Sequence, residues 1–133
     1  MMITGQVNEK LEAVIVLPVQ GAPAITHQFD AVIDTGFSAF LTLPRTVSET
    51  LGLTIESTGL LVLADGSEIQ TDICWVTVIW DGQAREVIAD VFETEVLVGM
   101  GLMKGYELCA GIMPGGPVTL KPLDPAPSLT SQA

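Results

Sequence analysis

Residues 29–44, with the sequence FDAVIDTGFSAFLTLP, place one carboxylate, Asp34, between two apolar segments. A carboxylate at the end of an apolar strand costs free energy unless it is solvated, paired or hydrogen-bonded. Asp34-Thr35-Gly36 suits a tight turn, because glycine reaches backbone geometry closed to other residues and the turn frees N–H groups to face the carboxylate. Thr35 adds a short, stiff hydroxyl that can bond to another segment. The stretch therefore predicts a strand, a turn carrying a functional acid, and a second strand.

Short apolar segments separated by Gly, Pro, Asn and Asp turns fill most of the remaining chain. Strands are expected over residues 3–7, 11–19, 29–34 and 39–44, and hairpins over residues 58–70, 73–92 and 106–123. The Asp-Gly pairs at 65–66 and 81–82 tolerate the positive φ angles of tight hairpin turns. This pattern predicts an all-β domain, built as a barrel or a sandwich.

Two short helices are expected among these strands. In residues 44–53, PRTVSETLGL, Pro44 suits the first helical position, Val47 and Leu51 lie four apart, and Gly52 can close the C-terminus. About one helical turn is expected after the buried strand end that precedes Gly99.

The size and composition limit the possible function. A chain of 133 residues suits one domain, which we place at residues 1–123, followed by a Pro- and Ser-rich tail, 124–133, that we expect to be disordered. Five Lys and Arg against sixteen Asp and Glu give a net charge of −11, which argues against a nucleic-acid partner. No apolar run approaches the ~20 residues of a membrane span. The start lacks the features of a secretory signal, so we expect a cytoplasmic protein without membrane partners.

Metal and cofactor sites are not expected. Cys74 and Cys109 are too far apart in sequence for a CxxC metal pair, and we expect both to be small buried thiols. His27 is the one histidine, and a lone histidine cannot supply a structural zinc site, so a surface position is expected.

A single carboxylate in such a loop could act only as an ordinary base, whereas a pair of carboxylates could hydrolyse a peptide bond. Two carboxylates within about 3 Å cannot both ionise, so one activates a water while the other protonates the peptide carbonyl. Asp34 is the only Asp-Thr-Gly or Asp-Ser-Gly aspartate in the chain, and Asp65 and Asp81 fall in polar hairpin turns. The second carboxylate must therefore come from a second copy of the chain, at the axis of a two-fold dimer.

With these motifs, the chain resembles the retropepsin-like (retroviral-type) aspartic proteases, specifically a small prokaryotic group with an Asp-Thr-Gly-Phe motif. The resemblance extends over about residues 3–123. VIDTGFSAFLTLP at 32–44 corresponds to the catalytic loop and the strand after it, and LVLADGSEI at 61–69 to the flap hairpin. VLVGMGLM at 96–103 corresponds to the segment and short helix that brace the catalytic loop.

The resemblance implies a closed barrel-like protomer that works as a homodimer on an extended peptide or protein substrate, without a cofactor. It makes Asp34 the catalytic carboxylate, Thr35 the residue that ties the two catalytic loops together, and Gly36 the turn. Residues of the loop and the flap would contact the substrate: Phe37, Ala64, Asp65, Gly66 and Ser67.

Three departures from the family pattern stand out. Phe37 occupies a place where retroviral enzymes usually carry a small residue, which would reshape the pocket beside the aspartates. The brace reads Gly99-Met100-Gly101 and lacks the polar residue that relatives use as a tie. The acidic flap tip would disfavour acidic substrates.

Other readings of the same residues remain open. A dimer of this fold could bind a peptide or protein without cleaving it. Asp34 could simply cap its own turn. GFSAF, residues 36–40, partly matches a serine nucleophile elbow, but Phe40 replaces the final Gly, and Ser38 would need His27 as its base.

Overall fold

The computed structural model describes residues 1–123, so the expected disordered tail lies outside the described residues. The helices are α1 (Arg45–Thr50) and α2 (Met100–Met103). The strands are β1 (Ile3–Val7), β2 (Ala13–Gln20), β3 (Thr26–Ile33), β4 (Leu41–Leu43), β5 (Ser57–Val62), β6 (Glu68–Trp80), β7 (Gln83–Val91), β8 (Leu97–Val98), β9 (Tyr106–Ala110) and β10 (Pro117–Pro122). Neither helix is long and apolar enough to cross a membrane.

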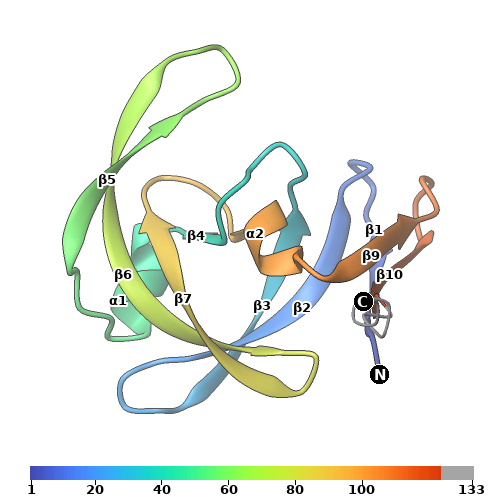
Figure 1. Ribbon diagram of the computed structural model, residues 1–133, viewed down its shortest axis with the longest axis horizontal. Coiled ribbons are helices and arrows are strands. Elements are labelled where there is room, and N and C mark those ends of the chain that lie inside the picture. Colours follow the sequence, from blue (N-terminus) through green and yellow to red (C-terminus); the bar gives the residue numbers. More distant parts are fainter. Residues whose placement is uncertain (124–133) are drawn as a thin grey trace, which may run out of the picture.

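The strands form one sheet that curls until two of its strands meet. Their order is β5-β6-β7-β4-β8-β3-β2-β1-β10-β9, and an additional pairing joins β6 to β2. This pairing, in which Val19 lies opposite Val78, closes a ring of strands from β2 around to β6 (Figure 1). The prediction of an all-β fold with two short helices is thus confirmed, and the ring gives the chain its barrel-like form.

The ring closes around an apolar core supplied by alternate residues of its strands. In β2, Ile15, Leu17 and Val19 are buried, while Val16 between them is 52% exposed. Such period-two burial is expected where one face of a strand packs inward and the other faces solvent. The outer face of β2 is therefore free to serve a site.

Turn residues end the elements where the sequence predicts. Asp81 and Gly82, both with positive φ (53° and 83°), form the tight turn between β6 and β7. Gly52, with φ 69°, follows the end of α1, a conformation that glycine adopts without steric cost. Pro44 lies one position earlier than expected, as the N-cap of α1.

The start of β2 differs from the prediction. Leu11 has a φ of 63°, so the extended segment begins at Ala13 rather than at residue 11. The Asn8 side chain holds this turn, because its Oδ1 accepts hydrogen bonds from the backbone N–H groups of Lys10 (3.0 Å) and Glu12 (2.9 Å). The strand expected at residues 39–44 is likewise shorter, and β4 retains only Leu41–Leu43.

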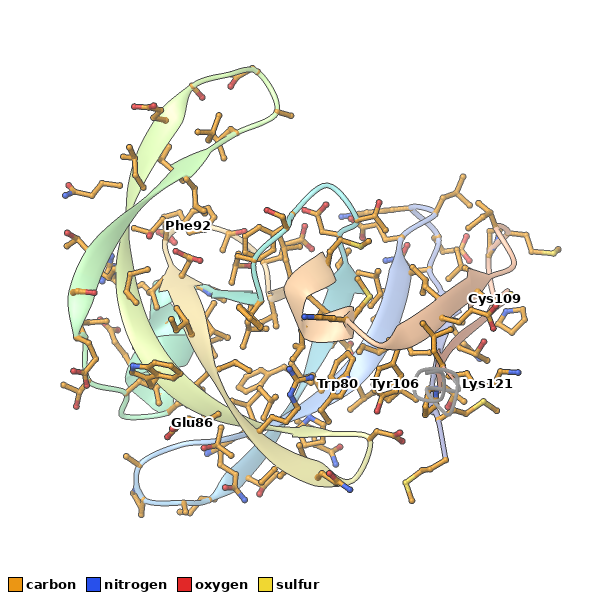
Figure 2. All side chains as sticks on the ribbon, viewed as in Figure 1. Trp80, Glu86, Phe92, Tyr106, Cys109 and Lys121 are labelled. Atoms are coloured by element: carbon orange, nitrogen blue, oxygen red, sulfur yellow. The ribbon has the colours of Figure 1, made fainter. Side chains whose placement is uncertain are left out.

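The two cysteines have different environments. Cys74 is buried, and burial together with the charge of Asp90 raises the pKa of its thiol to about 11. Cys109 is exposed, so the prediction of a buried thiol is wrong there. It lies on β9, the last strand at its end of the sheet, where one side has no neighbouring strand (Figure 2). His27 is half-buried and stacks on Phe29, with 6.4 Å between the ring centroids.

Aromatic contacts connect this end of the sheet to the ring. Tyr106 on β9 meets Trp80 on β6 edge-on, with 5.8 Å between the ring centroids (Figure 2). The Tyr106 hydroxyl donates a hydrogen bond of 3.0 Å to Asp81 in the β6–β7 turn. Burial and this contact with Asp81 raise the pKa of Tyr106, so the hydroxyl stays protonated as a donor at neutral pH.

Candidate active site

Asp34 directly follows β3, at the point where this strand ends beside β8. The pairing of β3 with β8 is parallel and places Ile33 opposite Val98. The backbone N–H of Asp34 extends it with a hydrogen bond of 2.9 Å to the carbonyl of Val98. The strand thus fixes the backbone of Asp34 before the chain turns, while the side chain remains half-exposed.

The turn itself holds the carboxylate of Asp34. Its Oδ1 accepts a hydrogen bond of 2.9 Å from the backbone N–H of Gly36. The Asp34 carbonyl accepts a second bond, of 3.2 Å, from the N–H of Phe37. Within residues 1–123 no hydrogen bond to Oδ2 is found, so the second oxygen of this half-exposed group remains free to accept one. The turn therefore orients the carboxylate and leaves one oxygen available.

Thr35 is exposed at the tip of the same turn. Its hydroxyl makes no hydrogen bond to any other residue of the described chain. A short β-branched side chain loses little rotational freedom on binding, so it is a suitable group for a contact with another molecule. The expected hydrogen bond from Thr35 to a second such loop would require a second copy of the chain.

Gly99 and the first two residues of α2 hold the loop through backbone hydrogen bonds. The N–H groups of Gly99, Met100 and Gly101 donate hydrogen bonds to the carbonyls of Phe40 (3.0 Å), Phe37 (2.7 Å) and Ala39 (2.9 Å). The brace Gly99-Met100-Gly101 has no polar side chain, as the sequence indicates. Three main-chain hydrogen bonds hold the loop in its place.

The brace requires glycine because the loop approaches it so closely. A Cβ atom on Gly99 would overlap the carbonyl oxygen of Ala39, and it would come within 2.6 Å of the Phe37 ring. A Cβ on Gly101 would lie 2.9 Å from the same Ala39 oxygen. The Phe37 ring therefore lies against Gly99 and is half-buried. Sequence reasoning missed this packing contact, because it assigned Phe37 only to the substrate pocket.

The hairpin of β5 and β6 projects from the ring on the same side as the β3–β4 loop (Figure 1). Its tip consists of residues 63–67, all exposed. Asp65 Oδ1 accepts hydrogen bonds from both the backbone N–H (2.9 Å) and the hydroxyl (2.6 Å) of Ser67. These bonds favour the ionised carboxylate and lower the pKa of Asp65. The predicted hairpin and its Asp-Gly turn are confirmed.

The predicted site residues lie in two separate places in the structure. Asp34, Gly36 and Phe37 are linked by hydrogen bonds within one turn. The hairpin residues Ala64, Asp65, Gly66 and Ser67 form a separate, projecting tip. Within residues 1–123, no group of three His, Cys, Asp or Glu side chains lies close enough to hold a metal ion.

The serine-hydrolase reading fails on distance. His27 lies near the start of β3 and Ser38 lies beyond its end. At about 3.3 Å per residue, the six residues from position 27 to position 33 alone extend about 20 Å. The loop that carries Ser38 stays at that far end, against Gly101, so His27 does not reach the Ser38 hydroxyl as its base.

One further feature near Asp34 was not predicted from the sequence. An open groove of about 840 Å³ runs along β1, β2 and β3, and Val32, two residues before Asp34, forms part of its wall. The alternation of Asp30, Val32 and Asp34 along the chain was the available signal, because alternate residues of a strand share a face.

Comparison with known proteins supports the fold. No protein-family model matches the sequence, and no significant match was found among curated proteins. Among solved structures, the chain is similar to a retropepsin-like aspartic protease from Rickettsia conorii, with a TM-score of 0.59 and 15% sequence identity. The similarity covers 93% of this chain and 93% of that one. The chain therefore has a retropepsin-like fold.

Proposed function

We propose that the protein is an aspartic endopeptidase that works as a homodimer. Each subunit contributes Asp34, and the two-fold axis brings this carboxylate beside the partner subunit's Asp34. Thr35 of each loop uses its unpartnered hydroxyl to bond to the opposite loop. The β5–β6 hairpin closes over an extended peptide, whose backbone it contacts.

The reaction follows from two carboxylates that share one proton. The ionised carboxylate removes a proton from a water as the water oxygen attacks the peptide carbonyl carbon. The protonated carboxylate gives its proton to the carbonyl oxygen, which yields a tetrahedral diol. As the diol collapses, the C–N bond breaks and the departing nitrogen takes up a proton. The reaction requires neither a covalent intermediate nor a metal.

The observation that carries this proposal is the state of the Asp34 carboxylate. One oxygen is fixed by the Gly36 N–H at 2.9 Å, and the half-exposed side chain lies on a loop held by the main-chain brace. A carboxylate that only capped its turn would need neither this rigid support nor an exposed, unpartnered Thr35 beside it. The retropepsin-like fold adds the projecting hairpin on the same side.

Substitution of Asp34 with Asn tests the proposal. Asn keeps an oxygen that can accept the Gly36 hydrogen bond but cannot ionise. We expect Asp34→Asn to fold and dimerise like the wild type and to lose all peptide cleavage. The assay is mass spectrometry of a broad peptide library at acidic to neutral pH, with sedimentation velocity to measure dimerisation.

The matched control is Glu49→Gln, which removes one charge from the exposed side of α1. It should cleave the library like the wild type. If the wild-type dimer cleaves nothing, the protein is a peptide-binding dimer of this fold rather than an enzyme. A statine-type inhibitor should block any cleavage observed, because it occupies a pair of aspartates and not a serine or metal site.

A further inference from the structure

The groove along β1, β2 and β3 has an apolar floor on the outer face of the sheet. Val14 lies opposite Gln6 on one side and opposite Val32 on the other, and all three line the groove. Val16 adds a side chain that is 52% exposed. The β1–β2 turn forms one end of the groove.

The groove leads toward the candidate catalytic residue. Asp30, Val32 and Asp34 are alternate residues of one extended segment, so their side chains share a face. At about 3.3 Å per residue, Val32 lies about 7 Å and Asp30 about 13 Å from Asp34 along the strand. A peptide whose scissile bond is at Asp34 would therefore place side chains two to four residues from that bond over the groove.

Negative charge surrounds this apolar floor. Four carboxylates line the groove, those of Glu9, Glu12, Asp30 and Glu95, against one cation, Lys10. Among residues 1–123 the one ion pair joins Arg45 to Asp72, and neither residue lines the groove.

The position of Glu12 is set by the turn beside the groove. The Asn8 side-chain amide donates a hydrogen bond of 2.9 Å to Glu12 Oε1, while Asn8 Oδ1 holds the turn backbone. Glu12 is half-buried, so its carboxylate is partly shielded from solvent. A preformed carboxylate above an apolar floor suits a side chain with an aliphatic stem and a cationic end.

We propose that this groove, the acidic groove, binds a Lys or Arg side chain of an extended peptide substrate. The stem would lie on Val14, Val16 and Val32, and the cationic end would meet either Glu12, beside the β1–β2 turn, or Asp30, opposite Val16 on β3. This inference deepens the proposed function, since it names the substrate class of that site. In a two-fold dimer, one acidic groove would lie on each side of the scissile bond, so basic residues would be favoured on both sides.

The first test compares two fluorogenic peptides with an apolar central pair, one flanked by Lys and one by Ala at the same positions. We expect the wild type to cleave the Lys peptide about tenfold faster in kcat/KM, since each partly exposed charge pair contributes a few-fold. The double variant Glu12→Gln/Asp30→Asn should remove this preference, mainly through KM. Glu49→Gln/Glu86→Gln, with the same net charge, should keep it; Glu86 is exposed on β7, at the lower left of Figure 2.

The second test measures binding of the same two peptides to Asp34→Asn protein by fluorescence polarisation, so that it does not depend on cleavage. Tighter binding of the Lys peptide, lost when Glu12 and Asp30 are also replaced, supports the acidic groove even if the wild type cleaves nothing and the protease proposal fails. Equal cleavage of the two peptides by an active wild type overturns the groove and leaves the protease standing. Equal binding, or none, with an inactive wild type overturns both.

Discussion

At the scale of single residues, the candidate site depends on how closely the brace approaches the loop that carries Asp34. Gly99 and Gly101 have no room for a Cβ atom beneath Phe37 and Ala39. The Gly-Met-Gly sequence, which lacks a polar tie, is therefore a steric requirement of this loop. A larger residue at either position would push the loop away, and the Asp34 carboxylate would move with it because the same loop carries it.

Gly99→Ala tests this contact. Overpacking of this kind should lower the free energy of unfolding by about 1–3 kcal/mol. A shift of the loop by about 1 Å should reduce kcat/KM by about a hundredfold. Urea unfolding and the peptide-cleavage assay measure the two effects.

The control for Gly99→Ala is Gly115→Ala, at a glycine with φ 82° whose Cβ would meet no atom within 4 Å. It should cost about 1–2 kcal/mol through backbone conformation alone and leave kcat/KM unchanged. Wild-type activity in Gly99→Ala would show that the brace does not position the loop.

At the scale of elements, a buried carboxylate on β7 lies beside the base of the β5–β6 hairpin. Asp90 on β7 is 6% exposed and accepts a hydrogen bond of 2.9 Å from the Thr71 hydroxyl on β6. Burial raises the pKa of Asp90, and the bond from Thr71 offsets only part of that effect. Because the folded state holds this proton more tightly than the unfolded chain, Asp90 favours folding at low pH. That contribution is lost as pH rises from the ordinary aspartate pKa, about 4, through the raised value.

In the Asp90→Asn variant the side chain is neutral at every pH, so its free energy of unfolding does not fall through ionisation at this position. The free energy of unfolding of the variant, minus that of the wild type, should therefore increase as pH rises from about 4 to about 7. Urea unfolding at both pH values measures the difference, with Glu49→Gln as an exposed control. A constant difference would show that Asp90 keeps its ordinary pKa in the folded protein, and a difference that falls with pH would show a lowered pKa; either result would contradict the raised value.

The elements also show which parts of the fold could be predicted from sequence. Asp-Gly dipeptides set the hairpin turns at 65–66 and 81–82 through local backbone preference, so they were predicted correctly. The shortening of β4, the exposure of Cys109 and the acidic groove depend on pairing between distant strands. No local pattern encodes which strand ends a sheet or which outer faces lie side by side. The acid of the candidate site was identified because its motif is local, and the resemblance located the brace at Gly99-Met100-Gly101. The close contact between the brace glycines and the loop, and the groove, were not recognised.

At the scale of the whole molecule, one chain offers one Asp34, an exposed Thr35 and a ring of strands with open sheet ends at β5 and β9. The proposed chemistry needs two such carboxylates, so activity should belong to the pair and not to the chain. The net charge of −11 opposes association of two copies, and added salt would screen this repulsion.

The shared site is tested most directly by mixing wild-type and Asp34→Asn subunits in equal amounts, at a fixed total concentration where both dimerise and exchange. If both Asp34 carboxylates are required, only wild-type pairs cleave, and random pairing leaves about one quarter of the activity of undiluted wild type. Activity of about one half, linear in the wild-type fraction, would mean that each subunit acts alone and would contradict the shared site.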